Sequence, residues 1–170
     1  MASRISITSA MAAANAAGQL PSSSELEAVS SSLRKAQTRL NAAEVLTRNA
    51  DELSRSAVQF VFSKFPDAAS TAEFLFTSSL EAESHSFKED VDILLRLLTY
   101  CLVVGNDDPL ELKPLEEIFS QISYVIHKSS EISPLWYIEV LEFFRNNHGL
   151  SGESAVEISL YINYIIAAFR

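Results

Sequence analysis

The apolar residues of this 170-residue chain recur mostly at steps of three and four, which places them on one face of an α-helix. The longest pattern is an apolar seam of about three heptads, made of Leu26, Val29, Leu33, Ala36, Leu40, Ala43 and Leu46. Ser22 and Glu25 precede the seam at the spacing of a capping box. This pattern predicts a long helix that begins at Ser22.

The rest of the chain predicts further helices, whose ends coincide with Gly and Pro. They are expected at 5–17, about 53–65, 71–104 with a break near 83–86, 115–127, 134–147, and from Ser151 onward. The sixth is assigned a core face of Trp136, Ile138, Val140, Leu141 and Phe144, and the last one of Val156, Leu160, Ile162, Ile165 and Ile166. No segment alternates like a β-strand, so an all-α fold with seven or eight helices is predicted.

The two N-terminal helices, joined by a tight turn before Pro21, would protrude from a globular body. Two interpretations of their apolar seam remain open. The seam packs against its own domain, or it is an interface that another subunit buries. The sequence alone does not separate these alternatives.

Composition narrows the classes of partner. The chain has 13 Lys and Arg against 22 Asp and Glu, a net charge of −9, which argues against nucleic-acid and anionic-membrane binding. Its most apolar stretch, 158–169, is shorter than the roughly 20 residues of a membrane span and contains Asn163. The N-terminus lacks the apolar core of a secretory signal. A soluble protein of a reducing compartment is expected.

Catalytic and metal-binding patterns are missing from the sequence. The three histidines, His85, His127 and His148, are far apart, and the acidic turn near 106–111 lacks the ligand spacing of a calcium loop. Cys101 lies in an apolar run and is predicted to be a buried core thiol. We therefore expect neither enzymatic activity nor a metal site.

Longer segments carry a family resemblance. They are Ala14–Leu20 with Ser23–Leu26, Lys64–Pro66, Leu95–Gly105, Ser133–Leu141, and Asn147–Gly152 with Ala155–Glu157. In this order, and over nearly the whole chain, they resemble the phycobiliprotein family, in particular the phycocyanin α subunits. The resemblance implies a single domain over 1–170, with a protruding helical hairpin at 1–47 and a globin-like body at 48–170.

The same resemblance implies partners and a location. Such a subunit pairs with a phycobiliprotein β subunit, and the αβ units assemble into rings with linker proteins; a homodimer is the alternative. The implied interface residues are Ile5, Ile7, Asn15, Leu20, Leu26, Val29 and Leu33, with Asn15 in place of an Asp that helps to hold the β partner in relatives. The implied place is a soluble phycobilisome on the cytoplasmic or stromal face of thylakoids, in a cyanobacterium or a red-algal plastid.

The chain departs from the family where α subunits attach an open-chain bilin. Relatives have a Cys, followed two and three residues later by Arg and Asp; the matching positions here are Phe87, Glu89 and Asp90. A phenyl ring has no nucleophile for the thioether, and Glu89 would repel a propionate. Cys101 lies 14 residues along the same predicted helix, about 21 Å away at ~1.5 Å per residue. The resemblance implies a vestigial bilin pocket, made of Phe87, Glu89, Asp90, Ile118, Trp136 and Tyr137.

Two functional hypotheses follow. The first is a non-pigmented subunit with a structural or regulatory role in a light-harvesting antenna, with no covalently bound cofactor. The alternative is a sensor or chaperone that holds a bilin or another tetrapyrrole noncovalently through Asp90. Infilling of the pocket by Phe87 and neighbouring apolar residues argues against the alternative. No histidine lies at a plausible position for a haem ligand.

Overall fold

The computed structural model describes residues 12, 14–18, 20–66, 87–105 and 133–169. Within these ranges the chain forms α2 (Ser23–Arg48), α3 (Ala50–Lys64), α5 (Phe87–Val104), α7 (Pro134–Asn147) and α8 (Gly152–Ala168), with no strand among them. The all-α prediction is confirmed. The predicted helix at 115–127, the segment 71–86 and most of 5–17 lie outside the described residues.

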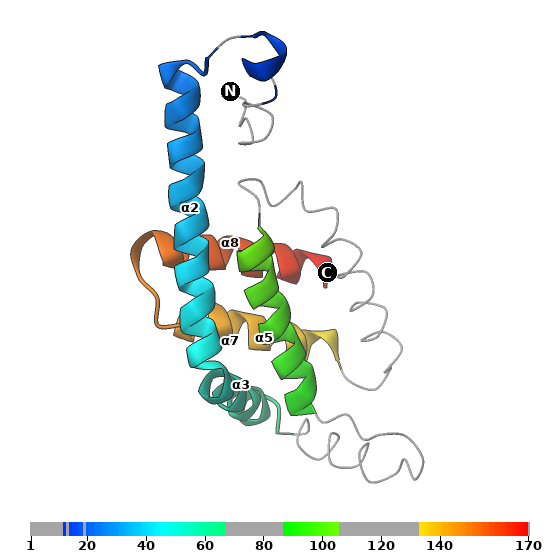
Figure 1. Ribbon diagram of the computed structural model, residues 1–170. Helices are drawn as coiled ribbons and strands as arrows, with labels where there is room; N and C mark the ends of the chain where they lie inside the picture. Colours follow the sequence, from blue (N-terminus) through cyan, green and yellow to red (C-terminus); the bar gives the residue numbers. More distant parts are fainter. Residues whose placement is uncertain (1–11, 13, 19, 67–86, 106–132, 170) are drawn as a thin grey trace.

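The helices form two layers, in which α7 and α8 cross behind α2 and α5 (Figure 1). The C-terminal half of α2 packs against α5 and α8, while α3 packs against α5 and α7. The N-terminal half of α2 extends beyond the other labelled helices (Figure 1). α5 in turn contacts α8 as well as α2 and α3.

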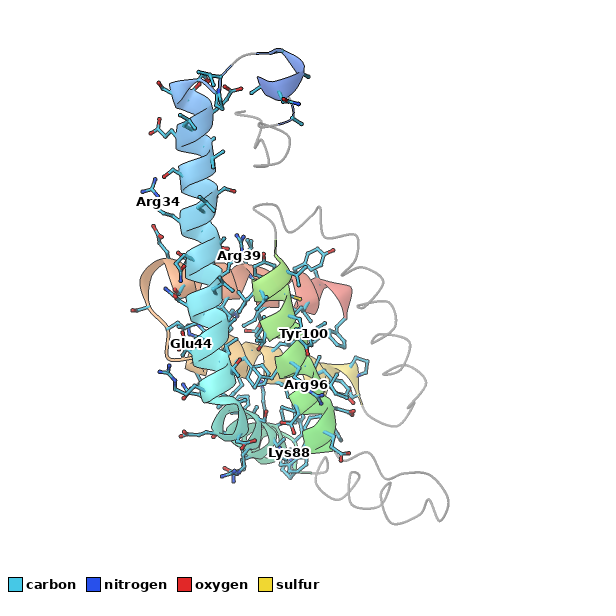
Figure 2. The ribbon with its side chains drawn as sticks, viewed as in Figure 1. Arg34, Arg39, Glu44, Lys88, Arg96 and Tyr100 are labelled. Atoms are coloured by element: carbon cyan, nitrogen blue, oxygen red, sulfur yellow. The ribbon has the colours of Figure 1, made fainter. Side chains whose placement is uncertain are left out.

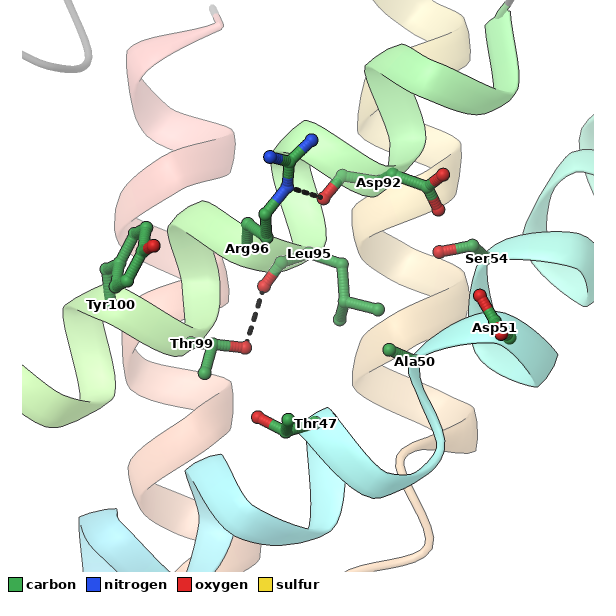
Figure 3. A pocket seen from close by; sticks show the side chains of 9 residues that line it. All are labelled: Thr47, Ala50, Asp51, Ser54, Asp92, Leu95, Arg96, Thr99 and Tyr100. Carbon is green, nitrogen blue, oxygen red and sulfur yellow. Dashed lines mark hydrogen bonds between the residues drawn. The ribbon is translucent and has the colours of Figure 1, made fainter.

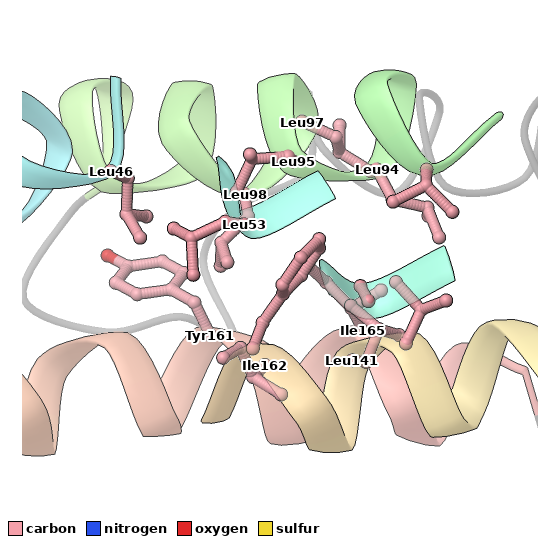
Figure 4. Packing of buried hydrophobic residues seen from close by; sticks show 14 of the residues in the cluster. Leu46, Leu53, Leu94, Leu95, Leu97, Leu98, Leu141, Tyr161, Ile162 and Ile165 are labelled. Carbon is pink, nitrogen blue, oxygen red and sulfur yellow. The ribbon is translucent and has the colours of Figure 1, made fainter. Parts of the chain in front are cut away.

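The core lies between these layers (Figure 4). Buried residues of α5 recur every three or four positions, as expected for a helix with one wide apolar face. Against them pack residues of the other four helices, which include Leu46, Leu53, Leu141, Tyr161, Ile162 and Ile165. Burial of this cluster is the main favourable term in folding.

The predicted helix starts and stops are confirmed where they are described. At the start of α2, the backbone N–H of Ser22 donates to Glu25 Oε2 (2.6 Å) and the N–H of Glu25 donates to Ser22 Oγ (3.3 Å). Ser133 Oγ accepts from the backbone N–H of Leu135 at the start of α7. Gly149, just beyond the end of α7, has a φ of 71°, which glycine adopts without strain.

Two of the predicted core faces are partly wrong. Val156 and Leu160 of α8 are 69% and 44% exposed, whereas Ile158 and Tyr161 are buried in their place. Apolar residues lie on more than one face of α8, so the helical period fits several stripes, and packing against α2 and α5 selects one. In α7, Tyr137 is buried and Ile138 is only partly buried.

In the part of the chain that the structure describes, no helix is both long and apolar enough to cross a bilayer. This finding agrees with the short length of the apolar stretch at 158–169.

His148 closes the C-terminal end of α7 and is buried. Its Nδ1 accepts a hydrogen bond from the backbone N–H of Leu150 (2.9 Å), and Glu52 of α3 borders the same surface hollow. Burial lowers the pKa of His148 below its usual 6.5. Protonation at Nδ1 would also remove the acceptor for Leu150.

Because the unfolded chain binds a proton at His148 more readily than the folded chain, acid favours unfolding. We predict that the free energy of unfolding falls as the pH drops below about 6.5 and continues to fall through the lowered folded-state pKa. Urea denaturation of the wild type and of His148→Gln at about pH 7.5 and about pH 5 checks this prediction. Between these two pH values, the wild type should lose more stability than His148→Gln. Equal losses would contradict the assignment of this pH dependence to His148.

Candidate functional site

Phe87, the first residue of α5, lies at the centre of an aromatic cluster and is 1% exposed. Its ring centroid is 5.7 Å from those of Phe62 and Tyr137 and 5.9 Å from that of Trp136. The Trp136 ring meets it edge to face at 83°, a favoured geometry for aromatic pairs. Phe169 stacks on Tyr137 at 6.0 Å. We call these five residues the Phe87 cluster.

Local sequence explains how α7 contributes to the cluster. Ser133 caps α7 and Pro134 occupies its first turn, so the helix begins just before Trp136 and Tyr137. Both side chains are buried against the start of α5. The beginnings of α5 and α7 therefore meet at Phe87.

A hydrogen bond fixes the same junction. Tyr137 Oη donates to Asp90 Oδ2 at 2.7 Å, across 47 residues of sequence. Burial raises the pKa of Tyr137, and the neighbouring Asp90 carboxylate raises it further. Tyr137 therefore remains protonated and acts as the donor. Asp90 lies in the first turn of α5, where the helix dipole favours a negative charge.

The structure thus brings together four of the residues predicted for the pocket: Phe87, Asp90, Trp136 and Tyr137. Glu89 is exposed on the same first turn of α5, and Ile118 lies outside the described residues. Among the residues in view, no group of acidic, His or Cys side chains could hold a metal ion.

Sequence reasoning missed Phe62 and Phe169 as members of the cluster. Phe62 follows Val58 by four residues and precedes Phe65 by three, and all three pack against the core. This spacing is a usable helical signal. No local pattern could have paired Asp90 with Tyr137, because the two are remote in sequence.

Cys101 provides the only thiol of the 170-residue chain. It is fully buried on α5, and burial raises its pKa to about 12. Since the thiolate is the reactive form of cysteine, this thiol is a poor nucleophile at neutral pH. The prediction of a buried core thiol is confirmed.

The apolar seam of α2 divides into two parts. Its C-terminal part, Ala43 and Leu46, is buried in the body. Leu26, Leu33 and Leu40, seven residues apart on one face, are 56%, 57% and 46% exposed, and we call them the leucine stripe. Among the described residues, none buries these three leucines.

The other predicted interface residues that the structure describes, Asn15, Leu20 and Val29, lie in or before the N-terminal part of α2. Leu20, which precedes the helix, is almost fully exposed. Asn15 is exposed and Val29 is half-buried, while Ile5 and Ile7 lie outside the described residues. The described members thus present mostly accessible surface.

Seven residues beyond Leu40, Thr47 continues the stripe into a cleft of about 500 Å³ (Figure 3). The cleft lies between α2, α3 and α5 and is lined by Thr47, Ala50, Asp51, Ser54, Asp92, Leu95, Arg96, Thr99 and Tyr100. On its α5 wall, Asp92 pairs with Lys88 (2.7 Å), and Arg96 Nε donates to the backbone oxygen of Asp92 (3.5 Å). Sequence reasoning did not find this cleft, although Asp92, Arg96 and Thr99 share one helical face.

The family model described as "Phycobilisome protein" matches residues 9–169. The chain belongs to this family. It is 35% identical to the phycoerythrocyanin alpha chain of Nostoc sp. strain PCC 7120, over 95% of this chain and 96% of that one. It is 32% identical to a C-phycoerythrin alpha chain of Synechocystis sp., over 94% and 95%, and 29% identical to the B-phycoerythrin alpha chain of Rhodella violacea, over 95% and 96%. The resemblance read from the sequence is confirmed.

A thioether-linked bilin needs a reactive thiol beside an open pocket. In this phycobilisome-family chain, the only thiol is buried and has a raised pKa. Phe87, which the sequence resemblance assigns to the attachment position, is a buried phenyl ring in contact with three other rings. The described residues therefore do not fit a covalently attached bilin.

If Phe87 fills this junction, its removal must leave a cavity. We predict that Phe87→Ala lowers the free energy of unfolding by about 3–5 kcal/mol, the usual cost for a buried Phe. The fluorescence of Trp136, the chain's single Trp, should shift to longer wavelength because the ring that covers its edge is lost. Urea denaturation followed by Trp emission measures both effects.

Phe60→Ala is the matched control. Phe60 also contacts another ring, Phe143, at 5.3 Å, but it is 37% exposed. It should lose less than half as much stability as Phe87→Ala and leave the folded-state emission unchanged. Similar losses of stability in Phe87→Ala and Phe60→Ala would contradict the assignment of Phe87 as the buried centre of the cluster.

Proposed function

We propose that this chain is an α-type phycobilisome subunit that contributes protein interfaces and no covalently attached pigment. The observation that carries the proposal is the burial of Phe87 among Phe62, Trp136 and Tyr137. A core packed at this density leaves little room for a tetrapyrrole. The absence of a second thiol anywhere in the sequence supports the same conclusion.

The partner in this proposal is a phycobiliprotein β subunit, and the contact surface is the leucine stripe. Leu26, Leu33 and Leu40 are about half exposed although they continue a seam that is buried further along α2. Apolar residues aligned over two heptads suit the packing of a second helix. The predicted protruding hairpin over 1–47 would present this face.

A subunit without a pigment would change how excitation passes through an antenna. An α subunit that completes an assembly without a pigment leaves only the bilins of its partners to carry excitation. Such a subunit could end or modify a row of pigmented units while it preserves the protein contacts. We place this assembly, with its linker proteins, at the cytoplasmic or stromal face of thylakoids.

The alternative, a noncovalent bilin site anchored by Asp90, has less support. The Asp90 carboxylate already accepts a hydrogen bond from Tyr137 (2.7 Å), and Phe87 occupies the adjoining space. A bilin would have to displace both interactions before it bound. We therefore retain the interface role as the function that the geometry supports best.

The interface is tested by placing charges on the leucine stripe. We predict that Leu26→Asp with Leu33→Asp abolishes capture of a phycocyanin or phycoerythrin β subunit in a pull-down, because two carboxylates would be buried without partners. Helix content by circular dichroism should remain, since both positions are more than half exposed.

The control variant is Ser24→Asp with Ala28→Asp. It adds the same two charges to α2, on exposed positions roughly opposite the stripe. This variant should still capture the β subunit. Retained binding by the leucine variant, or equal loss in both, would refute the proposed interface.

A further inference from the structure

A second groove lies on the other flank of α2, where the helix meets the start of α8. Its volume is about 630 Å³, and it is lined by Ser31, Arg34, Lys35, Thr38, Gly152, Glu153, Val156 and Glu157. Successive helical residues are about 100° apart, so Ser31 and Thr38 lie roughly opposite Leu33. The groove is therefore separate from the leucine stripe. A hydrogen bond from Ser154 Oγ to the backbone oxygen of Thr38 (3.5 Å) links the two helices that form its walls.

The two walls carry opposite charges. Arg34 and Lys35 lie on the α2 wall, and Glu153 and Glu157 lie on the α8 wall; Figure 2 labels Arg34 on this side of α2. Elsewhere in the described chain, neighbouring charges do pair, as in Glu44 with Arg48 at 2.7 Å. In the same described ranges, none of the four groove charges makes an ion pair.

An apolar contact area accompanies these charges. Val156 lies between the two glutamates and is 69% exposed, and Leu160 follows one turn later at 44%. These are the two α8 residues expected in the core and found at the surface. Apolar side chains with a polar rim are the usual arrangement at a protein–protein contact.

We propose that this groove binds a second copy of the same chain about a two-fold axis that runs along it. Rotation about such an axis brings the basic α2 wall of each copy against the acidic α8 wall of the other. Arg34 and Lys35 of each copy then face the partner's Glu153 and Glu157, so the charged contact forms twice. Val156 and Leu160 supply apolar area. The contact is self-complementary because the walls are opposite in charge.

Other occupants fit the charges less well. A small anion or a nucleic acid would meet Glu153 and Glu157 as well as the chain's net charge of −9. A purely acidic or purely basic peptide would match one wall and be repelled by the other. The proposed contact leaves the leucine stripe free, so it would join two subunits that each retain their own β partner.

Charge reversal tests this contact in the full chain. We expect a concentration-dependent dimer in sedimentation velocity. Arg34→Glu with Lys35→Glu should weaken it at least about tenfold, and so should Glu153→Lys with Glu157→Lys, because each turns the facing pairs into like charges. All four substitutions together keep the net charge at −9 and should restore the dimer.

A mixing experiment separates specific pairing from a folding defect. The variant reversed on α2 and the variant reversed on α8 should each be monomeric alone, yet form a heterodimer when mixed, since opposite charges then face each other at both contacts. The leucine variant Leu26→Asp with Leu33→Asp should dimerise like the wild type.

Three results would overturn the proposal. One is a wild-type chain that stays monomeric at all concentrations; another is a dimer unaffected by charge reversal; the third is a dimer removed by the leucine variant instead. A monomeric wild type or a dimer unaffected by charge reversal leaves capture of the β subunit by the leucine stripe untouched, and the pull-down measures that capture separately.

Discussion

The packing of Phe87 is the constraint on which the rest of the structure depends. Its ring is buried where the beginnings of α5 and α7 meet α3, and it contacts Phe62, Trp136 and Tyr137. The Tyr137–Asp90 hydrogen bond holds the same junction from its polar side. In this phycobilisome-family chain, whose single thiol is buried, the proposed lack of a covalent pigment rests on this aromatic core.

Both proposed contact surfaces lie on α2. One flank of this helix carries the leucine stripe, which leads to the cleft between α2, α3 and α5. The other flank borders the groove with opposite charges on its walls. The two surfaces differ in chemistry, so we propose that one helix offers an apolar contact to a β subunit and a charged contact to a second copy.

Most of the described helix boundaries could be predicted, because capping residues and apolar periodicity act locally. Ser22 with Glu25, and Ser133 with Pro134, mark helix starts that the structure confirms. The core face of α8 was predicted less well: Val156 and Ile158 are both apolar, and only packing against other helices decides which is buried. The Tyr137–Asp90 contact joins remote segments and has no local signal. The Phe87 position was found through the family resemblance, not through periodicity.

The central claim, that this subunit carries no covalent pigment, is tested most directly by its visible absorption spectrum. The chain would be purified from the cells that make it and separated from its partners in acidic denaturant. Denaturation releases a noncovalent pigment and leaves a thioether-linked bilin on its protein. The account predicts no visible absorbance on this chain. A bilin band that remains on it would contradict the account.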